Sequence, residues 1–154
     1  MKIFDLTGKV ALITGSSQGI GFALAEGLAE AGAKIILNGR DEKKLITAKK
    51  KLQQKYESIS YLCFDVTDYG SVEHEIAQYY NQNLGIDILV NNAGMQHRAP
   101  LEDFPADKFE LLMKTNVSSV FNVGQAVAKR MIKKGQGKII NIASVQTALA
   151  RPGI

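Results

Sequence analysis

The sequence predicts an α/β domain in which a parallel sheet is covered by helices on both faces. Three observations support this fold class. Short apolar runs rich in β-branched residues alternate along the chain with longer segments of helical periodicity. The apolar runs lack the polar alternation of half-buried strands, which indicates burial on both faces. A helical segment separates each pair of runs, and such a crossover places consecutive strands parallel to one another.

The composition is that of one ordinary globular domain. Of the 154 residues, 45% are hydrophobic and 22% are charged, and a chain of this size can bury a core without cross-links. The single cysteine, Cys63, excludes a disulfide framework. No apolar run approaches the roughly 20 residues that span a bilayer, and the start MKIFDLTGKV lacks a signal-peptide pattern. We expect one cytoplasmic domain over residues 1–154.

Five apolar runs are expected to form the strands of the sheet. Their sequences are KVALIT, KIILN, SYLCF, IDILVNN and KIINIA, at about Lys9–Thr14, Lys34–Asn38, Ser60–Phe64, Ile86–Asn92 and Lys138–Ala143. The last of these is expected to lie at an edge of the sheet in this chain, where it exposes apolar groups.

Helical segments connect these strands. The first, at about Gly19–Ala31, ends at Gly32, which favours a left-handed conformation. Its predicted apolar face consists of Ile20, Ala23, Leu24, Gly27, Leu28 and Ala31. A later helix is predicted at about Tyr69–Asn83, with a buried stripe of Val72, Ile76, Tyr79 and Tyr80. The last is one long helix at roughly Ala106–Lys134.

The net charge of +4 is carried largely by lysines, and six of them lie in the segment DEKKLITAKKKLQQKY. Such a run is compatible with nucleic-acid binding, but no arginine or aromatic residue interleaves with the lysines to stack on bases. Apolar residues recur at helical spacing on the other side: Leu45, Ala48, Leu52 and Tyr56. We therefore interpret the segment as an amphipathic helix with a solvated lysine face. No nucleic-acid or membrane partner is expected.

The segment TGSSQGIG lies directly between the first strand and the first helix. Gly15 allows a tight exit from the strand, Gly19 lets a ligand approach the backbone, and Gly21 permits close packing of helix on sheet. The helix N-terminus then offers N–H groups and a partial positive charge to a phosphate. Glycines that serve packing alone are the alternative, but the strand–turn–helix context favours a dinucleotide site.

The glycine spacing is G-x-x-x-G-x-G, followed by Asp65-Val66 after the third strand and by NNAG at the end of the fourth. This ordered set resembles the short-chain dehydrogenase/reductase family over Thr7–Ile154. The resemblance implies a Rossmann-like doubly wound sheet, NAD(P)-dependent interconversion of a secondary alcohol and a ketone, and no metal site. The residues that it places at the cofactor are Gly15, Ser17, Gln18, Gly19, Ile20, Gly21, Arg40, Asp65, Val66, Asn92, Ala93 and Gly94.

The resemblance gives Asp65 the adenine amino group, with the backbone of Val66 beside it. An aspartate after a strand often caps the next helix instead. Because Thr67 and Asp68 follow directly and could provide that cap, the adenine role is favoured. The wall along the adenine ribose is expected from Asn92, Ala93 and Gly94.

The end of the second strand determines which nicotinamide cofactor is preferred. An acidic residue there would bind the ribose hydroxyls and repel a 2′-phosphate, but this sequence has Gly39 followed by Arg40. Glycine leaves room for a phosphate, and a guanidinium can pair with it bidentately. NADP(H) is therefore expected in preference to NAD(H). The alternative is a solvated Arg40 paired with Asp41 or Glu42.

The catalytic set that the resemblance implies is Asn, Ser, Tyr and Lys. Asn116, inside the long helix, corresponds to the Asn that holds a water in a proton relay; asparagine is a poor helix former, which suggests a role beyond packing. Ser144, after the fifth strand, corresponds to the Ser that orients and polarises the substrate carbonyl, the alternative being a turn serine. The Tyr-x-x-x-Lys pair, which handles the proton, is expected about thirteen residues after Ser144, beyond Ile154.

Without this pair, we expect the 154 residues to bind adenine nucleotides weakly, to aggregate readily and to show no dehydrogenase activity by themselves. The chain is interpreted as a fragment, the N-terminal part of an oxidoreductase. The alternative is a short product that binds nucleotide, or pairs with another chain, without catalysis. The complete protein is expected to be a homo-oligomer, usually a tetramer in this family.

The loop MQHRAPLEDFP follows NNAG at the expected substrate entrance. With FDLTGK at the start and SVQ after the fifth strand, it resembles the gluconate 5-dehydrogenase branch of the family. This implies a sugar-acid substrate, with His97 or Arg98 at its carboxylate and Gln146 at its hydroxyls. For the first two, solvent exposure or pairing with Glu102 and Asp103 is the alternative. The nearest other enzyme is a 3-oxoacyl-carrier-protein reductase, whose acidic partner would suit a basic surface.

Overall fold

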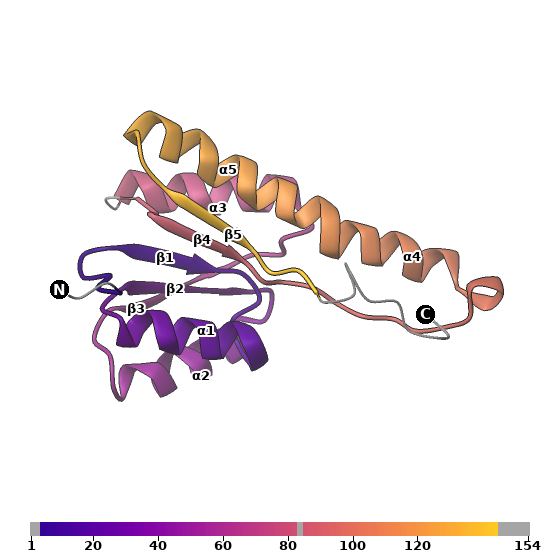
Figure 1. Ribbon diagram of the computed structural model, residues 1–154, viewed down its shortest axis with the longest axis horizontal. Coiled ribbons are helices and arrows are strands. Elements are labelled where there is room, and N and C mark those ends of the chain that lie inside the picture. The colour runs from indigo at the N-terminus through magenta and orange to yellow at the C-terminus, as the bar shows by residue number, and fades with distance from the viewer. Residues whose placement is uncertain (1–3, 83–84, 145–154) are drawn as a thin grey trace.

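The computed structural model describes residues 4–82 and 85–144, and it shows a five-stranded parallel sheet between two layers of helices (Figure 1). The strand order is β3-β2-β1-β4-β5. The bounds of the strands are β1 (Val10–Ile13), β2 (Lys34–Gly39), β3 (Ile59–Cys63), β4 (Ile88–Asn91) and β5 (Lys138–Asn141). The expected doubly wound α/β fold is confirmed.

The strand order reverses at β1. The chain proceeds outward from β1 to β2 and β3, and then returns so that β4 pairs with the other side of β1. Leu12 is accordingly in register with Ile36 on one side and with Leu89 on the other. The connections that leave β1 and β4 diverge to opposite faces, and such a reversal opens a crevice at the carboxyl ends of the strands.

Helices cover both faces of the sheet. Figure 1 shows α1 (Gly19–Glu30) and α2 (Glu42–Gln53) on one face, and α3 (Tyr69–Gln82) and α5 (Ser119–Lys134) on the other. A glycine in the left-handed conformation follows the end of α1 and of α5, as expected. These are Gly32, with a φ of 97°, and Gly135, with a φ of 75°.

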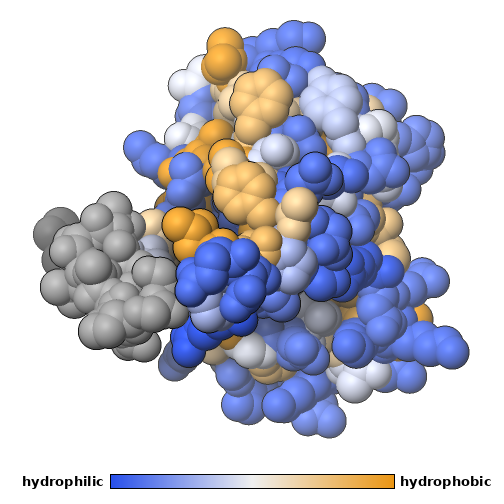
Figure 2. All heavy atoms as spheres, turned by 90° about the vertical axis from the view of Figure 1, so that its right-hand side faces the viewer, coloured by the Kyte–Doolittle hydropathy of each residue, from blue (hydrophilic) through white to orange (hydrophobic). Residues whose placement is uncertain are grey.

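The predicted long helix is interrupted. It consists of α4 (Ala106–Met113), one turn of π-helix, η2 (Lys114–Ser118), and α5, and a short 3₁₀ turn, η1 (Leu101–Asp103), precedes it. Such π-turns insert a residue into a helix and often occur at functional sites. In Figure 1, α4 extends beyond the carboxyl ends of the strands. Apolar side chains are exposed along this helical segment; they include Phe109, Met113, Val117 and Phe121. Figure 2 shows apolar residues among hydrophilic ones on the face seen there.

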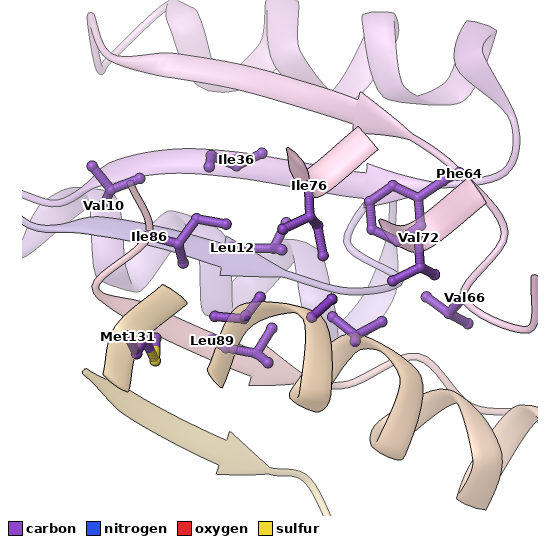
Figure 3. Close-up of a cluster of buried hydrophobic side chains, with 13 residues drawn as sticks. Val10, Leu12, Ile36, Phe64, Val66, Val72, Ile76, Ile86, Leu89 and Met131 are labelled. Carbon is purple, nitrogen blue, oxygen red and sulfur yellow. The ribbon is translucent and has the colours of Figure 1, made fainter. Parts of the chain in front are cut away.

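Two apolar cores lie on either side of the sheet because successive strand residues point to opposite faces. Leu12, Ile36 and Leu89 pack against α3 and α5 (Figure 3). Ala11 and Ile13 point the other way, toward α1 and α2. The buried stripe predicted for α3 is confirmed, since Val72 and Ile76 are fully buried while Tyr79 and Tyr80 are partly buried against the same core. The apolar side predicted for α2 is also confirmed, and its lysine side is exposed.

The predicted apolar face of α1 is only partly correct, since Leu24 and Leu28 pack partly buried against the core beneath the helix. The helix buries Gly21, Ala25 and Ala29, whereas Ile20 is 69% exposed and Ala23 is exposed. These three small residues lie at i, i+4 and i+8, and they let the helix axis approach the sheet closely. The fully buried positions of α1 are thus held by small residues, while Phe22, Leu24 and Leu28 pack partly buried against the same core.

Burial on both faces holds for β1, β2 and β4 but not for the two edge strands. Residues at the end of β3, such as Leu62, are half-buried, and all four residues of β5 are exposed. Ile139 and Ile140 are 41% and 47% exposed. The apolar content of these two runs, taken alone, predicted full burial. An edge strand has a neighbouring strand on one side only, so its residues stay more exposed. The expected edge position of the fifth strand is confirmed.

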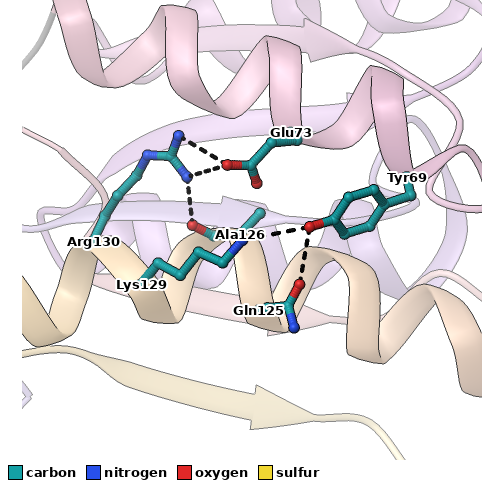
Figure 4. A network of polar contacts seen from close by, with 6 residues as sticks. All are labelled: Tyr69, Glu73, Gln125, Ala126, Lys129 and Arg130. Atoms are coloured by element: carbon teal, nitrogen blue, oxygen red, sulfur yellow. Dashed lines mark hydrogen bonds and ion pairs between the residues drawn. The ribbon is translucent and has the colours of Figure 1, made fainter.

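Polar contacts join α3 to α5 above the apolar core (Figure 4). Both terminal nitrogens of Arg130 lie 3.3 Å from Oε1 of Glu73. The hydroxyl of Tyr69 donates to Oε1 of Gln125 at 3.0 Å and accepts a longer bond from Lys129. These contacts fix the position of α5 against α3 at the periphery of the core.

Asp87 fastens the amino-terminal side of the sheet. It is 8% exposed; its Oδ2 accepts from the backbone N–H of Val10 at 3.0 Å, and its Oδ1 pairs with Nζ of Lys134 at 2.8 Å. Burial opposes ionisation of this carboxyl, but the hydrogen bonds from Lys134 and Val10 outweigh it and lower the pKa of Asp87. One carboxylate thus connects β1, the start of β4 and the end of α5.

Replacing Lys134 by Met is predicted to lower the free energy of unfolding at neutral pH by about 1–3 kcal/mol, because it leaves a buried carboxylate without its cation. The lowered pKa of Asp87 means that its contribution exists above the unfolded-state pKa and disappears as the pH falls through the folded-state value. The difference between wild type and Lys134→Met should therefore shrink in acid. Chemical denaturation from pH 7 to pH 3 measures it, with Lys133→Met as the exposed control. A difference that is independent of pH would contradict this role.

Candidate functional site

A cleft of about 620 Å³ lies at the carboxyl ends of the strands, where the strand order reverses. Every residue that the sequence assigned to the cofactor lines it: Gly15, Ser17, Gln18, Gly19, Ile20, Gly21, Arg40, Asp65, Val66, Asn92, Ala93 and Gly94. The lining residues that the sequence analysis did not single out as ligands include Asn38, Lys44, Phe64, Met95, Leu111 and Thr115. The structure therefore brings the predicted residues together, while their assignment as ligands remains a prediction.

The glycine turn has the conformation that its three roles require. Gly15 and Gly19 both have a φ of 62°, in the left-handed region that side chains avoid. A Cβ on Gly15 would lie 2.9 Å from Cα of Ala93, and one on Gly21 would lie 2.5 Å from the carbonyl oxygen of Gly15. A Cβ on Gly19 would meet no atom within 4 Å. Gly15 and Gly21 are thus needed for packing, while Gly19 leaves the backbone open to a ligand.

The start of α1 is uncapped. Its N-cap residue, Gln18, makes no side-chain capping hydrogen bond, and the first turn contains no acidic residue. The N–H groups there have no intrahelical partners, and the helix dipole adds a partial positive charge. Because the turn borders the cleft, these groups can receive the oxygens of a phosphate.

Asn38 forms the floor of the cleft. Its fully buried amide donates to the carbonyl oxygens of Leu62 and Phe64, each at 3.2 Å. Its Oδ1 accepts a 3.4 Å bond from Gly15, and its backbone N–H donates to Ser16 Oγ at 3.0 Å. One side chain therefore joins the ends of β1, β2 and β3. The sequence signal for this role was an asparagine at the end of a buried apolar strand, where an amide must find partners.

Thr14 connects the glycine turn to the NNAG segment. Its Oγ1 accepts the backbone N–H groups of Asn92 and Ala93 at 2.9 and 3.0 Å. In return, the side-chain amide of Asn92 donates to the carbonyl oxygens of Thr14 and Gly15 at 3.0 and 3.2 Å. The walls of the cleft formed after β1 and β4 are thereby held in one arrangement.

Asp65 lies half-buried at the end of β3. Its Oδ1 accepts both the N–H and the hydroxyl of Thr67 at 2.8 Å. Burial opposes ionisation, but these two bonds and the charges of Arg40 and Lys114 prevail and lower the pKa of Asp65. It is Asp68 whose Oδ1 accepts the N–H of Ser71, at the start of α3. The geometry thus favours an ionised Asp65 at the cleft over the capping alternative.

Arg40 is exposed at the rim of the cleft. The described residues provide it with no ion-pair partner. The two acids that could have paired with it have other contacts: Asp41 accepts the N–H of Lys44, and Glu42 accepts the hydroxyl of Tyr61 at 3.1 Å. The guanidinium is therefore available to an anionic ligand.

Asn116 lies in η2, at the place where the long helix is interrupted. Its Oδ1 accepts the N–H of Met95 at 2.8 Å, and its Nδ2 donates to the carbonyl of Met95 at 2.9 Å. A Cβ on Gly94 would lie 3.3 Å from the same Oδ1. The side chain thus fixes the segment after NNAG against the helix. Its predicted part in a proton relay stays a prediction.

Ser144 is exposed and follows β5 by three residues. Two hydrogen bonds hold the end of β5 against β4. The side-chain amide of Asn91 donates to Oδ1 of Asn141 at 2.9 Å, and the N–H of Ile142 donates to the carbonyl of Asn91. Ser144 therefore leaves the sheet at the same edge as the cleft. Its catalytic assignment is not decided by this placement.

His97 and Arg98, two of the predicted substrate residues, are not among the residues that line the cleft. His97 is half-buried with its ring edge-to-face against Phe104, at 5.3 Å between centroids, and Arg98 is exposed. Among the described residues, neither forms an ion pair with Glu102 or Asp103. Gln146 lies outside the described residues. In residues 4–82 and 85–144 no helix is long and apolar enough to cross a membrane, and no cluster of His, Cys, Asp and Glu side chains could hold a metal ion.

Comparison with known proteins gives a consistent result. Residues 9–154 match the short chain dehydrogenase family. A gluconate 5-dehydrogenase of Gluconobacter oxydans is 51% identical over 99% of this chain and 59% of its own length, and a 5-keto-D-gluconate 5-reductase of Escherichia coli is 40% identical over 99% and 60%. A crystal structure of a gluconate 5-dehydrogenase from Burkholderia cenocepacia in complex with NADP and tartrate is 50% identical, with a TM-score of 0.93, over 98% of this chain and 59% of that one. The chain thus spans about three fifths of these relatives.

A pair of glycine substitutions in α1 tests the turn. Gly21→Ala is predicted to weaken nucleotide binding and to destabilise the fold by about 1–3 kcal/mol, because the added methyl group overlaps the carbonyl of Gly15. Gly27→Ala adds a methyl group to open space in the same helix and should stabilise it by about 1 kcal/mol without affecting binding. Thermal unfolding and an NADPH titration compare the two. Equal behaviour of the variants would show that the close approach of α1 is unnecessary.

Proposed function

Because the chain belongs to the short-chain dehydrogenase family, we propose that it forms the NADP-binding part of an oxidoreductase that interconverts a secondary alcohol and a ketone. The substrate pair that we propose is gluconate and 5-ketogluconate. The observation that carries the proposal is the convergence of the glycine turn, Arg40, Asp65 and NNAG on one cleft. The names of the relatives support the substrate class.

The residues of the cleft fit the adenosine half of a dinucleotide. The open backbone at Gly19 and the uncapped start of α1 suit the pyrophosphate. Asp65 lines the cleft and has a lowered pKa, and its carboxylate would accept a hydrogen bond from the adenine amino group. Asn92 and Ala93, both held by Thr14, would form the wall along the ribose together with Gly94.

The preference for NADP(H) rests on the rim of the cleft. Arg40 has no ion-pair partner among the described residues and can donate to a 2′-phosphate. Gly39 beside it leaves space, since a Cβ there would make only ordinary contacts, the closest at 3.6 Å to Leu45. No acidic side chain occupies the position that would receive the 2′-hydroxyl of NAD(H).

Bound NADP(H) supplies or accepts a hydride at the reacting carbon. The chain's own part is to orient the substrate: the Ser144 hydroxyl would donate a hydrogen bond to the carbonyl oxygen, where negative charge develops. Asn116 fixes the segment after NNAG and would hold the water of a proton relay. The Tyr-x-x-x-Lys pair expected beyond Ile154 would transfer the proton, so residues 1–154 alone would bind nucleotide without turnover.

The substrate would approach over the loop after NNAG. His97 or Arg98 would meet the carboxylate of a sugar acid, and Gln146 its hydroxyls. We also propose that the complete protein is a homo-oligomer. The exposed apolar side chains of α4, η2 and α5, from Phe109 to Phe121, are a surface that a second subunit could cover.

Cofactor preference is tested at two neighbouring positions. Arg40→Ala should weaken NADPH binding about tenfold or more, because charge-assisted hydrogen bonds contribute about 1.5–3 kcal/mol, and it should leave NADH binding unchanged. Gly39→Asp should favour NADH, because its carboxylate can bind ribose hydroxyls and repels a phosphate. Fluorescence titration of both cofactors gives the dissociation constants. An equal loss for NADH and NADPH in Arg40→Ala would rule out the phosphate role.

Activity tests the substrate. The complete polypeptide should reduce 5-ketogluconate with NADPH, whereas residues 1–154 alone should show no turnover. Arg98→Ala should raise KM more than it lowers kcat, because a carboxylate remote from the reacting carbon is held similarly in ground and transition states. Turnover of acyl-carrier-protein substrates without turnover of keto-gluconates would reverse the assignment. Steady turnover by residues 1–154, lost in Ser144→Ala, would show a proton donor within this chain.

A further inference from the structure

We propose that Lys44 is a second specificity-determining residue, whose ammonium group acts together with Arg40 on the 2′-phosphate of NADP(H). The proposal rests on the proposed function, because it concerns the same cleft. It assigns a role to a lysine that the sequence pattern placed among the solvated lysines of α2.

The position of Lys44 differs from that of the other lysines of α2. It lines the cleft together with Gly39, Arg40 and Asp41, whereas the remaining lysines of the helix do not. Lys43 precedes it directly and is exposed, but a rotation of about 100° per residue places its side chain on another side of the helix. Lys44 is therefore the α2 lysine whose side chain borders the proposed phosphate position.

The two cations line the same cleft as Ser17 of the glycine turn. A Cβ on Gly39 would lie 3.6 Å from Leu45 of α2 and 3.8 Å from Oγ of Ser17. The first turn of α2 and the turn after β1 thus approach each other around Gly39. A group attached to the adenine ribose at this place would meet Arg40 and Lys44.

The acidic residues of this segment do not neutralise the two cations. The sequence from Arg40 to Lys44 contains two acids, yet Oδ1 of Asp41 accepts the backbone N–H of Lys44 at 3.1 Å as the cap of α2. The carboxylate of Glu42 is directed to the hydroxyl of Tyr61. Neither Arg40 nor Lys44 forms an ion pair with any described residue.

The charge of the ligand explains why two cations are useful. A phosphate monoester carries about −1.5 to −2 charges at neutral pH, which exceeds the charge of one guanidinium. Arginine supplies a planar pair of donors, while lysine acts as a mobile point charge. The two side chains together match the charge of the phosphate. NAD(H) has a neutral 2′-hydroxyl in its place, so neither cation would gain an ion pair there.

The test uses the full chain and four ligands: NADPH, NADH, adenosine 2′,5′-bisphosphate and 5′-AMP. Lys44→Gln should weaken binding of the two 2′-phosphorylated ligands roughly three- to tenfold, a range set by charged hydrogen bonds at exposed sites. Binding of NADH and 5′-AMP should change by less than about twofold, and Lys43→Gln should change none of the four affinities. The affinity of Lys44→Gln for the bisphosphate should also fall less steeply with salt than that of wild type.

The outcomes separate this inference from the proposed function. If Lys44→Gln binds all four ligands like wild type while Arg40→Ala loses the 2′-phosphorylated ones, the role of Lys44 is overturned and the NADP assignment stands. An equal loss for phosphorylated and unphosphorylated ligands also overturns it, because that pattern indicates a structural effect. If wild type binds NADPH no more tightly than NADH, the proposed cofactor preference itself fails.

Discussion

The cleft depends on two buried polar side chains that hold four strand ends together. Thr14 accepts two N–H groups from the segment after β4, and Asn38 donates to two carbonyl groups at the end of β3 while it accepts from the turn after β1. Buried groups of this kind need every partner, since an unsatisfied one costs about 1–3 kcal/mol. The relative positions of the glycine turn, Arg40, Asp65 and NNAG are therefore set by the interior of the protein and not by the flexible surface of the cleft.

The fold followed from the sequence because a parallel sheet has a simple pattern. Runs such as VALI, which are apolar throughout, indicated strands covered on both faces, and the intervening helices fixed their direction. The pattern failed where size or position outweighed hydrophobicity. The fully buried residues of α1 are Gly21, Ala25 and Ala29, because a close approach to the sheet requires small side chains. The apolar residues of β5 are exposed because no further strand among the described residues covers that edge.

The site could be predicted where the backbone conformation or a close contact allows only one residue type. Gly15, Gly19 and Gly21 could be assigned because each conformation or close contact excludes a side chain. The residues that the sequence missed are positioned by three-dimensional contacts that no spacing reveals. In the sequence, Asn38 is only the last residue of an apolar run, and Lys44 is one of several lysines in a charged helical segment. The contact of Asn116 in the π-turn with Met95 likewise joins residues 21 positions apart.

We propose that this cleft holds the adenosine half of NADP with its 2′-phosphate at the start of α2. The most direct measurement is a crystal structure of the chain with adenosine 2′,5′-bisphosphate. We expect the 2′-phosphate within hydrogen-bond distance of Arg40 and Lys44, the 5′-phosphate at the N–H groups of the glycine turn, and the adenine amino group at Asp65. A ligand bound with its 2′-phosphate in solvent, or with the adenine away from Asp65, would contradict it.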